Sequence, residues 1–176
     1  MKEPLAYRLR PQSLDEVLGQ THILQDKGLL KRCINEKRLF SMIFFGPPGS
    51  GKTTVASILA KGVELPLKEF NAVTGNKKDL DEIFSEAKIA GQLVLVVDEV
   101  HRLNKDKQDL LLPYVEEGLV VMIGLTTSNP YFSINPAIRS RCVLCEFKTI
   151  SEEAMREALL RALSAPMSHL SITLDD

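Results

Sequence analysis

The feature that most constrains this chain is a glycine-rich loop placed between an apolar run and a stretch with helical spacing. Residues 46–53 fit the pattern G-x-x-x-x-G-K-[ST] completely, with apolar residues 42–45 before them and an expected helix at residues 54–61 after them. Glycines let successive backbone N–H groups turn toward one anion, and the start of the helix adds a favourable dipole. A glycine-rich turn that ends in Lys-Thr by chance is the alternative, but the flanking strand and helix favour a phosphate-binding loop.

The polar residues at the end of this loop suit a nucleotide. The Lys52 ammonium can reach the outer phosphates as a point charge, and the Thr53 hydroxyl can serve as a ligand of Mg²⁺. The nucleotide-binding residues expected in this segment are Gly46, Pro47, Pro48, Gly49, Ser50, Gly51, Lys52, Thr53 and Thr54.

A second candidate site follows the apolar run at residues 93–97, where the chain continues with Asp98 and Glu99. In a phosphate-loop protein, an acid at the end of a buried strand can hold the water shell of Mg²⁺, and Asp98 fits this role. Glu99 is suited to orient and deprotonate a water that attacks the γ-phosphate. A solvated strand end is the alternative, but the phosphate loop upstream favours catalysis.

The pattern of apolar residues predicts an α/β fold with a mainly parallel sheet. Continuous apolar or β-branched runs, which are typical of strands buried on both faces, alternate with stretches of helical spacing. The runs are residues 42–45, 93–97, 120–125 and 142–147. One expected helix ends at Gly91, and its apolar face consists of Leu80, Ile83, Phe84 and Ala87.

Two more helices are expected on the C-terminal side. One follows Asn104, a suitable N-cap, and ends at Gly118, with Pro113 inside it at a position that should bend it. The other opens at Ser151, where acidic residues suit the positive start of a helix. Little sequence follows this helix before residue 176, so we expect the chain to be cut there rather than finished.

Composition excludes several classes of protein. With 44% hydrophobic and 26% charged residues, 10 glycines and 9 prolines among 176 residues, the chain is unlike a disordered, collagen-like or coiled-coil protein. A net charge of −1 indicates no general attraction to nucleic acid or membranes. The chain shows no secretory signal, and no apolar run approaches the ~20 residues that cross a bilayer. Three cysteines without a signal favour a reducing compartment, so we expect a cytoplasmic protein.

Two further groups have less specific patterns. Cys142 and Cys145 have C-x-x-C spacing, but residues i and i+3 of a strand face opposite sides, so zinc is not expected. His101 follows the two acids closely, and a hydrogen bond to a catalytic residue suits it better than the role of base.

Polar residues also follow the run at residues 120–125, in the segment Thr126-Thr127-Ser128-Asn129. They would lie beside the γ-phosphate if this strand sits between the strands that precede the phosphate loop and the acids. Arg141 comes just before the last run, at the expected edge of the sheet and far from its own site. It could serve a neighbouring subunit as an arginine finger, and a surface salt bridge is the alternative.

Together these segments resemble the AAA+ ATPases of the clamp-loader type, and within them the family of replication-associated recombination protein A and the Werner helicase-interacting protein. The resemblance covers nearly the whole chain. Its segments are residues 5–11 (LAYRLRP), 19–22 (GQTH), 41–53, 71–74 (NAVT), 98–102 (DEVHR), 124–130 (GLTTSNP) and 140–142 (SRC).

The resemblance implies roles for individual residues. Asp98 and Glu99 are then the Walker B pair, Thr127 is the sensor 1 residue with Asn129 as the second choice, and Arg141 is the finger that acts in trans. The substrate would be ATP with Mg²⁺. The adenine would be wrapped by a segment that includes Tyr7, Arg10, Val17 and Leu18.

The resemblance also implies an architecture and a setting. The fold would be a three-layer αβα sandwich with a five-stranded sheet: an N-terminal segment at residues 1–40, an ATPase core at 41–150 and the beginning of a truncated helical lid at 151–176. Partners would be other copies in a ring, forked or single-stranded DNA, and replication proteins such as single-strand binding protein. A bacterial member would be associated with the nucleoid.

Two functions remain open at this point. One is an ATPase motor domain that hydrolyses ATP when assembled, and Glu99 favours it. The other is a nucleotide-gated interaction module with little turnover, which the short lid favours. A small-molecule kinase is a weaker third, because no acceptor site is visible.

Overall fold

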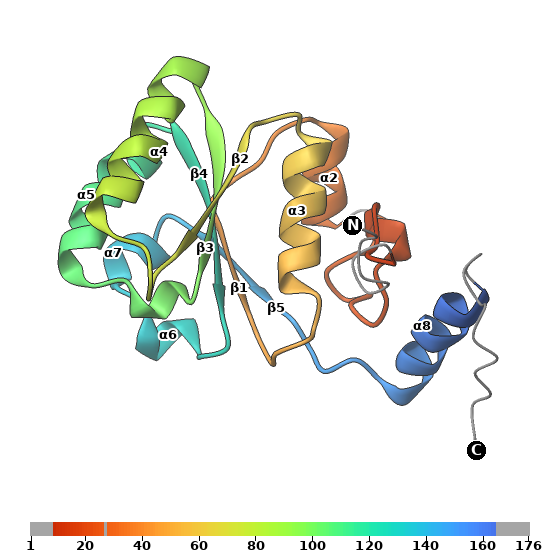
Figure 1. Ribbon diagram of the computed structural model, residues 1–176. Helices are drawn as coiled ribbons and strands as arrows, with labels where there is room; N and C mark the ends of the chain where they lie inside the picture. Colours follow the sequence, from red (N-terminus) through yellow and green to blue (C-terminus); the bar gives the residue numbers. More distant parts are fainter. Residues whose placement is uncertain (1–8, 27, 165–176) are drawn as a thin grey trace, which may run out of the picture.

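The computed structural model describes residues 9–26 and 28–164, and these form a three-layer α/β structure (Figure 1). Within this part of the chain, five strands pair in the order β2-β3-β4-β1-β5, and every pair is parallel. The strands are β1 (Met42–Phe45), β2 (Leu67–Asn71), β3 (Leu93–Asp98), β4 (Val120–Thr126) and β5 (Val143–Glu146). The expected α/β fold with a mainly parallel sheet is confirmed.

Helices cover both faces of the sheet. On one face lie α2 (Leu29–Asn35) and α3 (Lys52–Gly62), and on the other α4 (Lys77–Ala90), α5 (Lys105–Glu116) and the short α7 (Pro136–Arg139). The alternation along β1 divides the core accordingly: Met42 and Phe44 pack with α2 and α3, while Ile43 packs with α4 and α5. Short turns η1 (Leu14–Glu16), η2 (Val100–Arg102) and α6 (Pro130–Ser133) link these elements, and α8 (Glu152–Ser164) follows the sheet.

Most predicted helices are present with shifted ends. The helix after the glycine-rich loop begins at Lys52, two residues before the predicted start, because Gly51 serves as its N-cap. Helix α5 begins after the predicted cap Asn104, whose side chain accepts the backbone N–H of Lys107, and continues as one element past Pro113 to Glu116. Helix α8 begins one residue after Ser151.

Strand β2 was not predicted. Its sequence, Leu-Lys-Glu-Phe-Asn, has charged residues in the middle and no continuous apolar run. It forms the edge of the sheet, and only Phe70 is buried. An edge strand exposes one side to solvent, so it does not need the uniformly apolar sequence of a central strand.

The strand order determines where a site can form. Strand β4 lies between β1 and β3, so the loops after these three strands emerge together at the carboxyl edge. Open parallel sheets bind ligands at this edge. Among the described helices, none has both the length and the apolar character needed to cross a membrane.

Candidate active site

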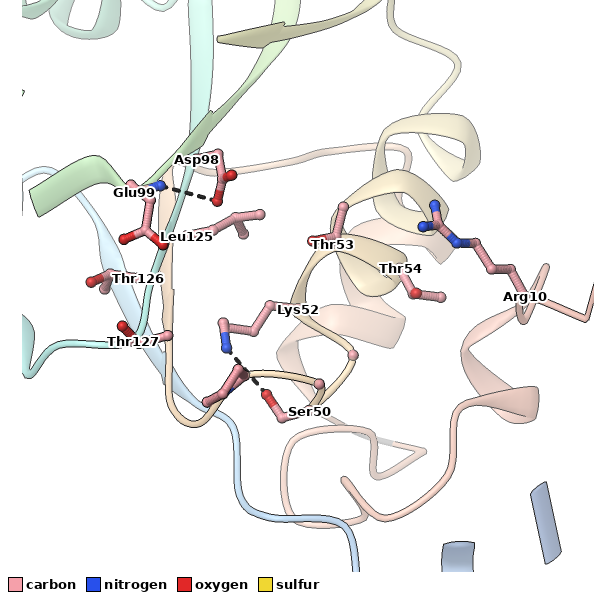
Figure 2. A pocket seen from close by; sticks show the side chains of 13 residues that line it. Arg10, Ser50, Lys52, Thr53, Thr54, Asp98, Glu99, Leu125, Thr126 and Thr127 are labelled. Atoms are coloured by element: carbon pink, nitrogen blue, oxygen red, sulfur yellow. Dashed lines mark hydrogen bonds between the residues drawn. The ribbon is translucent and has the colours of Figure 1, made fainter. Parts of the chain in front are cut away.

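A cavity of about 340 Å³ opens at the carboxyl edge of the sheet, where the loops after β1, β3 and β4 meet (Figure 2). Figure 2 shows Lys52 and Thr53 on one side of it, with Asp98, Glu99 and the end of β4 on the other. The cavity is lined by Arg10, Pro48, Gly49, Ser50, Gly51, Lys52, Thr53, Thr54, Asp98, Glu99, Leu125, Thr126 and Thr127.

Glycines shape the loop between β1 and α3. Gly46, with φ of 142°, lies against the end of β5: a Cβ atom there would stand 2.0 Å from the carbonyl oxygen of Phe147. Gly49 and Gly51 also have positive φ, and their Cβ positions are open. A left-handed backbone at these positions is available to glycine at little cost, which explains why the loop needs it.

Lys52 directs its side chain back into the loop. Its Nζ donates to the carbonyl oxygens of Gly46 at 2.8 Å and Pro47 at 2.7 Å, and to Oγ of Ser50 at 3.3 Å. Burial lowers the pKa of the Lys52 ammonium, while the negative charges of Glu99 and Asp98 act in the opposite direction. The loop therefore holds a partly desolvated cation at the place where the phosphate pattern predicts one.

Asp98 and Glu99 leave the end of β3 in different directions. The backbone N–H of Glu99 donates to Oδ1 of Asp98 at 3.0 Å, and the amide of Asn71, on the neighbouring strand, donates to Oδ2 at 3.5 Å. Glu99 itself has a left-handed backbone, with φ of 51° and ψ of 44°, and begins the turn η2. Two carboxylates on adjacent residues thus face one cavity from separate positions.

His101 lies behind Glu99, on the same turn. Its Nδ1 is 3.3 Å from Oε2 of Glu99 and 2.8 Å from Oγ1 of Thr126, at the end of β4. His101 does not line the cavity. Its hydrogen bond is made to Thr126, and the Glu99 carboxylate lies beside the same nitrogen.

Thr127 and Asn129 have different positions and contacts in the structure. Thr127 lines the cavity, whereas the side-chain oxygen of Asn129 accepts the backbone N–H of Tyr131 and caps α6. A capping side chain is already engaged, which favours Thr127 of the two sensor 1 candidates.

Arg141 lies outside this cavity, just before the edge strand β5, as its position in the sequence suggested. Its guanidinium forms an ion pair with Glu116 of α5 and donates to the carbonyl oxygen of Ala137 at 2.6 Å. The residue is exposed, so both the finger and the surface salt bridge remain compatible with its place.

A second, apolar cavity of about 210 Å³ lies next to the phosphate loop. Val17 and Leu18 line it, together with Ser50, Gly51 and Thr54. Arg10 lines the first cavity and not this one, which separates it from the other predicted adenine contacts. Tyr7 lies outside the described residues.

The far wall of this apolar cavity was missed from the sequence. It consists of Ile150, Ala158, Arg161 and Ala162, from α8 and the residue before Ser151. The amphipathic pattern of α8 was visible, but nothing in it indicates which element the helix meets. Gln20 explains part of this placement: its buried amide donates to the carbonyl oxygens of Ser50 and Lys148 and accepts the N–H of Lys148.

The oxygen atoms near Lys52 suit Mg²⁺, which phosphate and water also coordinate, better than a metal ion that is coordinated by protein side chains alone. The described residues include no group of three or more His, Cys, Asp or Glu side chains that could hold a metal ion. Thr53 and Asp98 both line the first cavity, and Mg²⁺ commonly takes one or two protein oxygens with phosphate and water completing its shell.

The two cysteines of the C-x-x-C pattern pack on opposite faces of the sheet, as expected for a strand. Burial raises the pKa of Cys142 to about 12 and that of Cys145 to about 11. Burial therefore disfavours the thiolate form, which is the form that zinc binds.

Comparison with known proteins identifies relatives of this chain. The family model of the Holliday junction DNA helicase RuvB P-loop domain matches residues 9–139. Replication-associated recombination protein A from Bacillus subtilis is 45% identical over 99% of this chain, and the protein of that name from Escherichia coli K12 is 39% identical over 92%. These matches cover 42% and 37% of the two relatives, so the chain spans less than half of their length.

Solved structures give the same result for the fold. The RuvB Holliday junction branch migration motor of Thermotoga maritima matches with a TM-score of 0.76 and 28% identity. The match covers 89% of this chain and 54% of that one.

Proposed function

This chain belongs to the family of the RuvB P-loop domain, which consists of AAA+ ATPases, and from this premise we propose that its cavity binds ATP with Mg²⁺ and hydrolyses the γ-phosphate bond. One observation carries the proposal. The Lys52 ammonium and the carboxylates of Asp98 and Glu99 face the same cavity from opposite sides. A cation and two acids in this arrangement suit a bound phosphate chain and an attacking water.

Residues of the phosphate loop would bind and orient the substrate. The backbone N–H groups of the loop face the β-phosphate, and Lys52 exchanges its carbonyl contacts for phosphate oxygens. Thr53 and Asp98 are the residues that would hold Mg²⁺, the latter partly through water. Bound Mg²⁺ would supply charge neutralisation on the phosphate oxygens.

Glu99 would act on the water. Its carboxylate would accept a proton from the water as the oxygen attacks the γ-phosphorus; the bond from that phosphorus to the β,γ-bridging oxygen breaks, and ADP leaves with the bonding electrons. Thr127 would contact the γ-phosphate from the end of β4. The adenine would enter the apolar cavity beside Val17 and Leu18, and Arg10 would lie at the phosphate side of the same nucleotide. Tyr7 belongs to the predicted adenine contacts by sequence alone.

We further propose the wider setting that the relatives suggest. Residues 1–40 would contribute to the adenine site, residues 41–150 would form the ATPase core, and residues 151–176 would begin a helical lid. Copies would assemble side by side, with Arg141 reaching the nucleotide of a neighbour. The names of the relatives speak of replication, recombination and Holliday junctions, which supports work on DNA. The protein would act at forks or junctions, with single-strand binding protein as a partner, in the cytoplasm or at the nucleoid.

Substitution of Glu99 by Gln tests the catalytic part of this proposal. We expect Glu99→Gln to bind ATP with an unchanged dissociation constant and to lower kcat by ~10²- to 10⁴-fold, because the amide cannot accept the proton. The measurement pairs calorimetric ATP binding with a phosphate-release assay on the same sample. Turnover at the wild-type rate in this variant would remove Glu99 as the base. Tight binding without release in the wild-type chain would support the nucleotide-gated module instead.

A further inference from the structure

We propose that His101 is a positioning residue: a hydrogen bond between Nδ1 and the Thr126 hydroxyl fixes the imidazole, and the Nδ1 edge of the ring attracts the Glu99 carboxylate beside it and holds it in place. This inference rests on the proposed role of Glu99. It means that Thr126, at the end of β4, also determines where the Glu99 carboxylate lies.

The contacts place His101 between two elements. Nδ1 lies 2.8 Å from Oγ1 of Thr126 and 3.3 Å from Oε2 of Glu99. The Thr126 residue is 2% exposed and the His101 side chain 15% exposed, compared with 38% for the Glu99 side chain. The buried threonine therefore provides a fixed reference point, and the more accessible carboxylate is the group that needs holding.

The partners of Thr126 assign the hydrogen on the imidazole. Oγ1 of Thr126 also accepts the backbone N–H of Ser128 at 3.0 Å. A hydroxyl has two acceptor positions, so it can accept both this N–H and an Nδ1–H. An Nδ1–H places partial positive charge 3.3 Å from Oε2 of Glu99 and attracts the carboxylate, whereas a bare Nδ1 that accepts from Thr126 carries partial negative charge there and would repel it. Nδ1 is therefore the protonated nitrogen.

Backbone geometry brings the imidazole to this place. Glu99 adopts a left-handed conformation, and the turn η2 closes through the N–H of Arg102, which donates to the Glu99 carbonyl at 2.7 Å. Val100 of this turn packs against Gly124 of β4, where an added Cβ would stand 3.0 Å from a Val100 methyl. Because Gly124 has no side chain, the turn can approach β4 closely enough for His101 to reach Thr126.

His101 acts through Glu99 and not on the substrate. It does not line the cavity, whereas Glu99, Thr126 and Thr127 do. The contact thus links the carboxylate to the residue next to Thr127, so that a shift at the end of β4 would move Glu99. A misplacement of about 1 Å at a catalytic group can cost ~10²-fold in rate.

The first test observes the proton and does not depend on turnover. Two-dimensional ¹⁵N–¹H NMR of the imidazoles identifies which ring nitrogen carries hydrogen. We expect the Nδ1–H form for His101 and a change of its signals in Thr126→Val, with Thr126→Ser retaining them. An Nε2–H form in the wild-type protein would overturn the proposal.

The second test measures kinetics in a matched series. The amide nitrogen of Asn can replace Nδ1 of histidine, whereas that of Gln replaces Nε2. We expect His101→Gln and His101→Ala to lower kcat by ~10- to 100-fold with KM within about twofold, and His101→Asn to restore most of kcat. His22→Gln, at an exposed histidine that contacts the carbonyl of Glu146, serves as the control.

The outcomes separate this inference from the proposed function. Equal kcat in His101→Asn, His101→Gln and the wild type would overturn the positioning role. If His101→Ala fails to fold, the comparison of the Asn and Gln variants still decides. If Glu99→Gln retains full turnover while the Nδ1–H signal is present, the base assignment fails and the positioning role fails with it, although the contact itself exists.

Discussion

At the scale of single residues, Lys52 shows how the loop prepares for a ligand. An ammonium has three donors, and Lys52 directs all three to oxygens of its own loop. These contacts compensate for the burial that lowers its pKa. A phosphate can replace them by offering stronger, charged acceptors at the same nitrogen.

Gly46 is the residue whose replacement should damage this loop most. We expect Gly46→Ala to lower the free energy of unfolding by about 3 kcal/mol or more, because the new Cβ meets the Phe147 carbonyl and the backbone φ is unfavourable for alanine. Urea denaturation of both proteins measures this difference.

Gly91→Ala is the matched control, since Gly91 also has positive φ but open space at its Cβ position. It should cost only about 1–2 kcal/mol. Equal losses in the two variants would show that the contact with Phe147 contributes nothing.

At the scale of elements, the sequence predicted the strands and helices whose own residues show a recognisable apolar pattern. Strands β1, β3 and β4 are buried on both sides, so their apolar runs were sufficient evidence. Strand β2 has charged residues because it lies at the edge, and its pairing with β3 is a long-range property that local sequence does not contain. The short helices α6 and α7 were also missed, because four residues are too few to show helical spacing. Asn129 and Asn135 cap them.

In the candidate site too, local motifs could be predicted, whereas contacts between distant segments could not. Motif spacing located the phosphate loop, Asp98 and Glu99; residues 48–54 line one cavity with the two acids, whereas Gly46 and Pro47 do not line it. Of the adenine contacts that the resemblance implied, Val17 and Leu18 line the apolar cavity. The wall formed by α8 was not predicted, because it depends on how α8 returns to the N-terminal segment. The Gln20 contacts that fix this return join residues 128 positions apart.

Gln20 allows the docking of the N-terminal segment to be tested. We expect Gln20→Ala to lower the free energy of unfolding by about 1–3 kcal/mol, because it leaves the N–H and carbonyl of Lys148 without this partner in a part-buried place. Gln25→Ala, at an exposed glutamine, should change stability by less than about 0.5 kcal/mol. Thermal unfolding of the three proteins gives the comparison, and a Gln20 variant as stable as the Gln25 variant would contradict the account.

At the scale of the whole molecule, the cavity and Arg141 lie at different places on the sheet. The cavity lies at the carboxyl ends of β1, β3 and β4, whereas Arg141 precedes the edge strand β5 and lies outside that cavity. A guanidinium in this place can complete the cavity of a second copy only if copies meet side by side.

Arg141→Ala tests that arrangement. We expect it to lower kcat by ~10³-fold or more under conditions where the protein assembles, and to leave a monomer unchanged. Glu116→Gln breaks the same ion pair but keeps the guanidinium, so it should retain turnover. ATPase assays paired with light scattering distinguish the two states. An equal loss in a verified monomer would exclude the trans role.

The most direct test of the account is calorimetric titration of ATP with Mg²⁺ into the 176-residue chain and its Lys52→Ala variant. We predict saturable binding to the wild-type chain and at least ~10-fold weaker binding to the variant, because the charged contact to the phosphates is lost. The absence of binding to the wild-type chain, or equal affinity for both proteins, would contradict the assignment of this cavity as the nucleotide site.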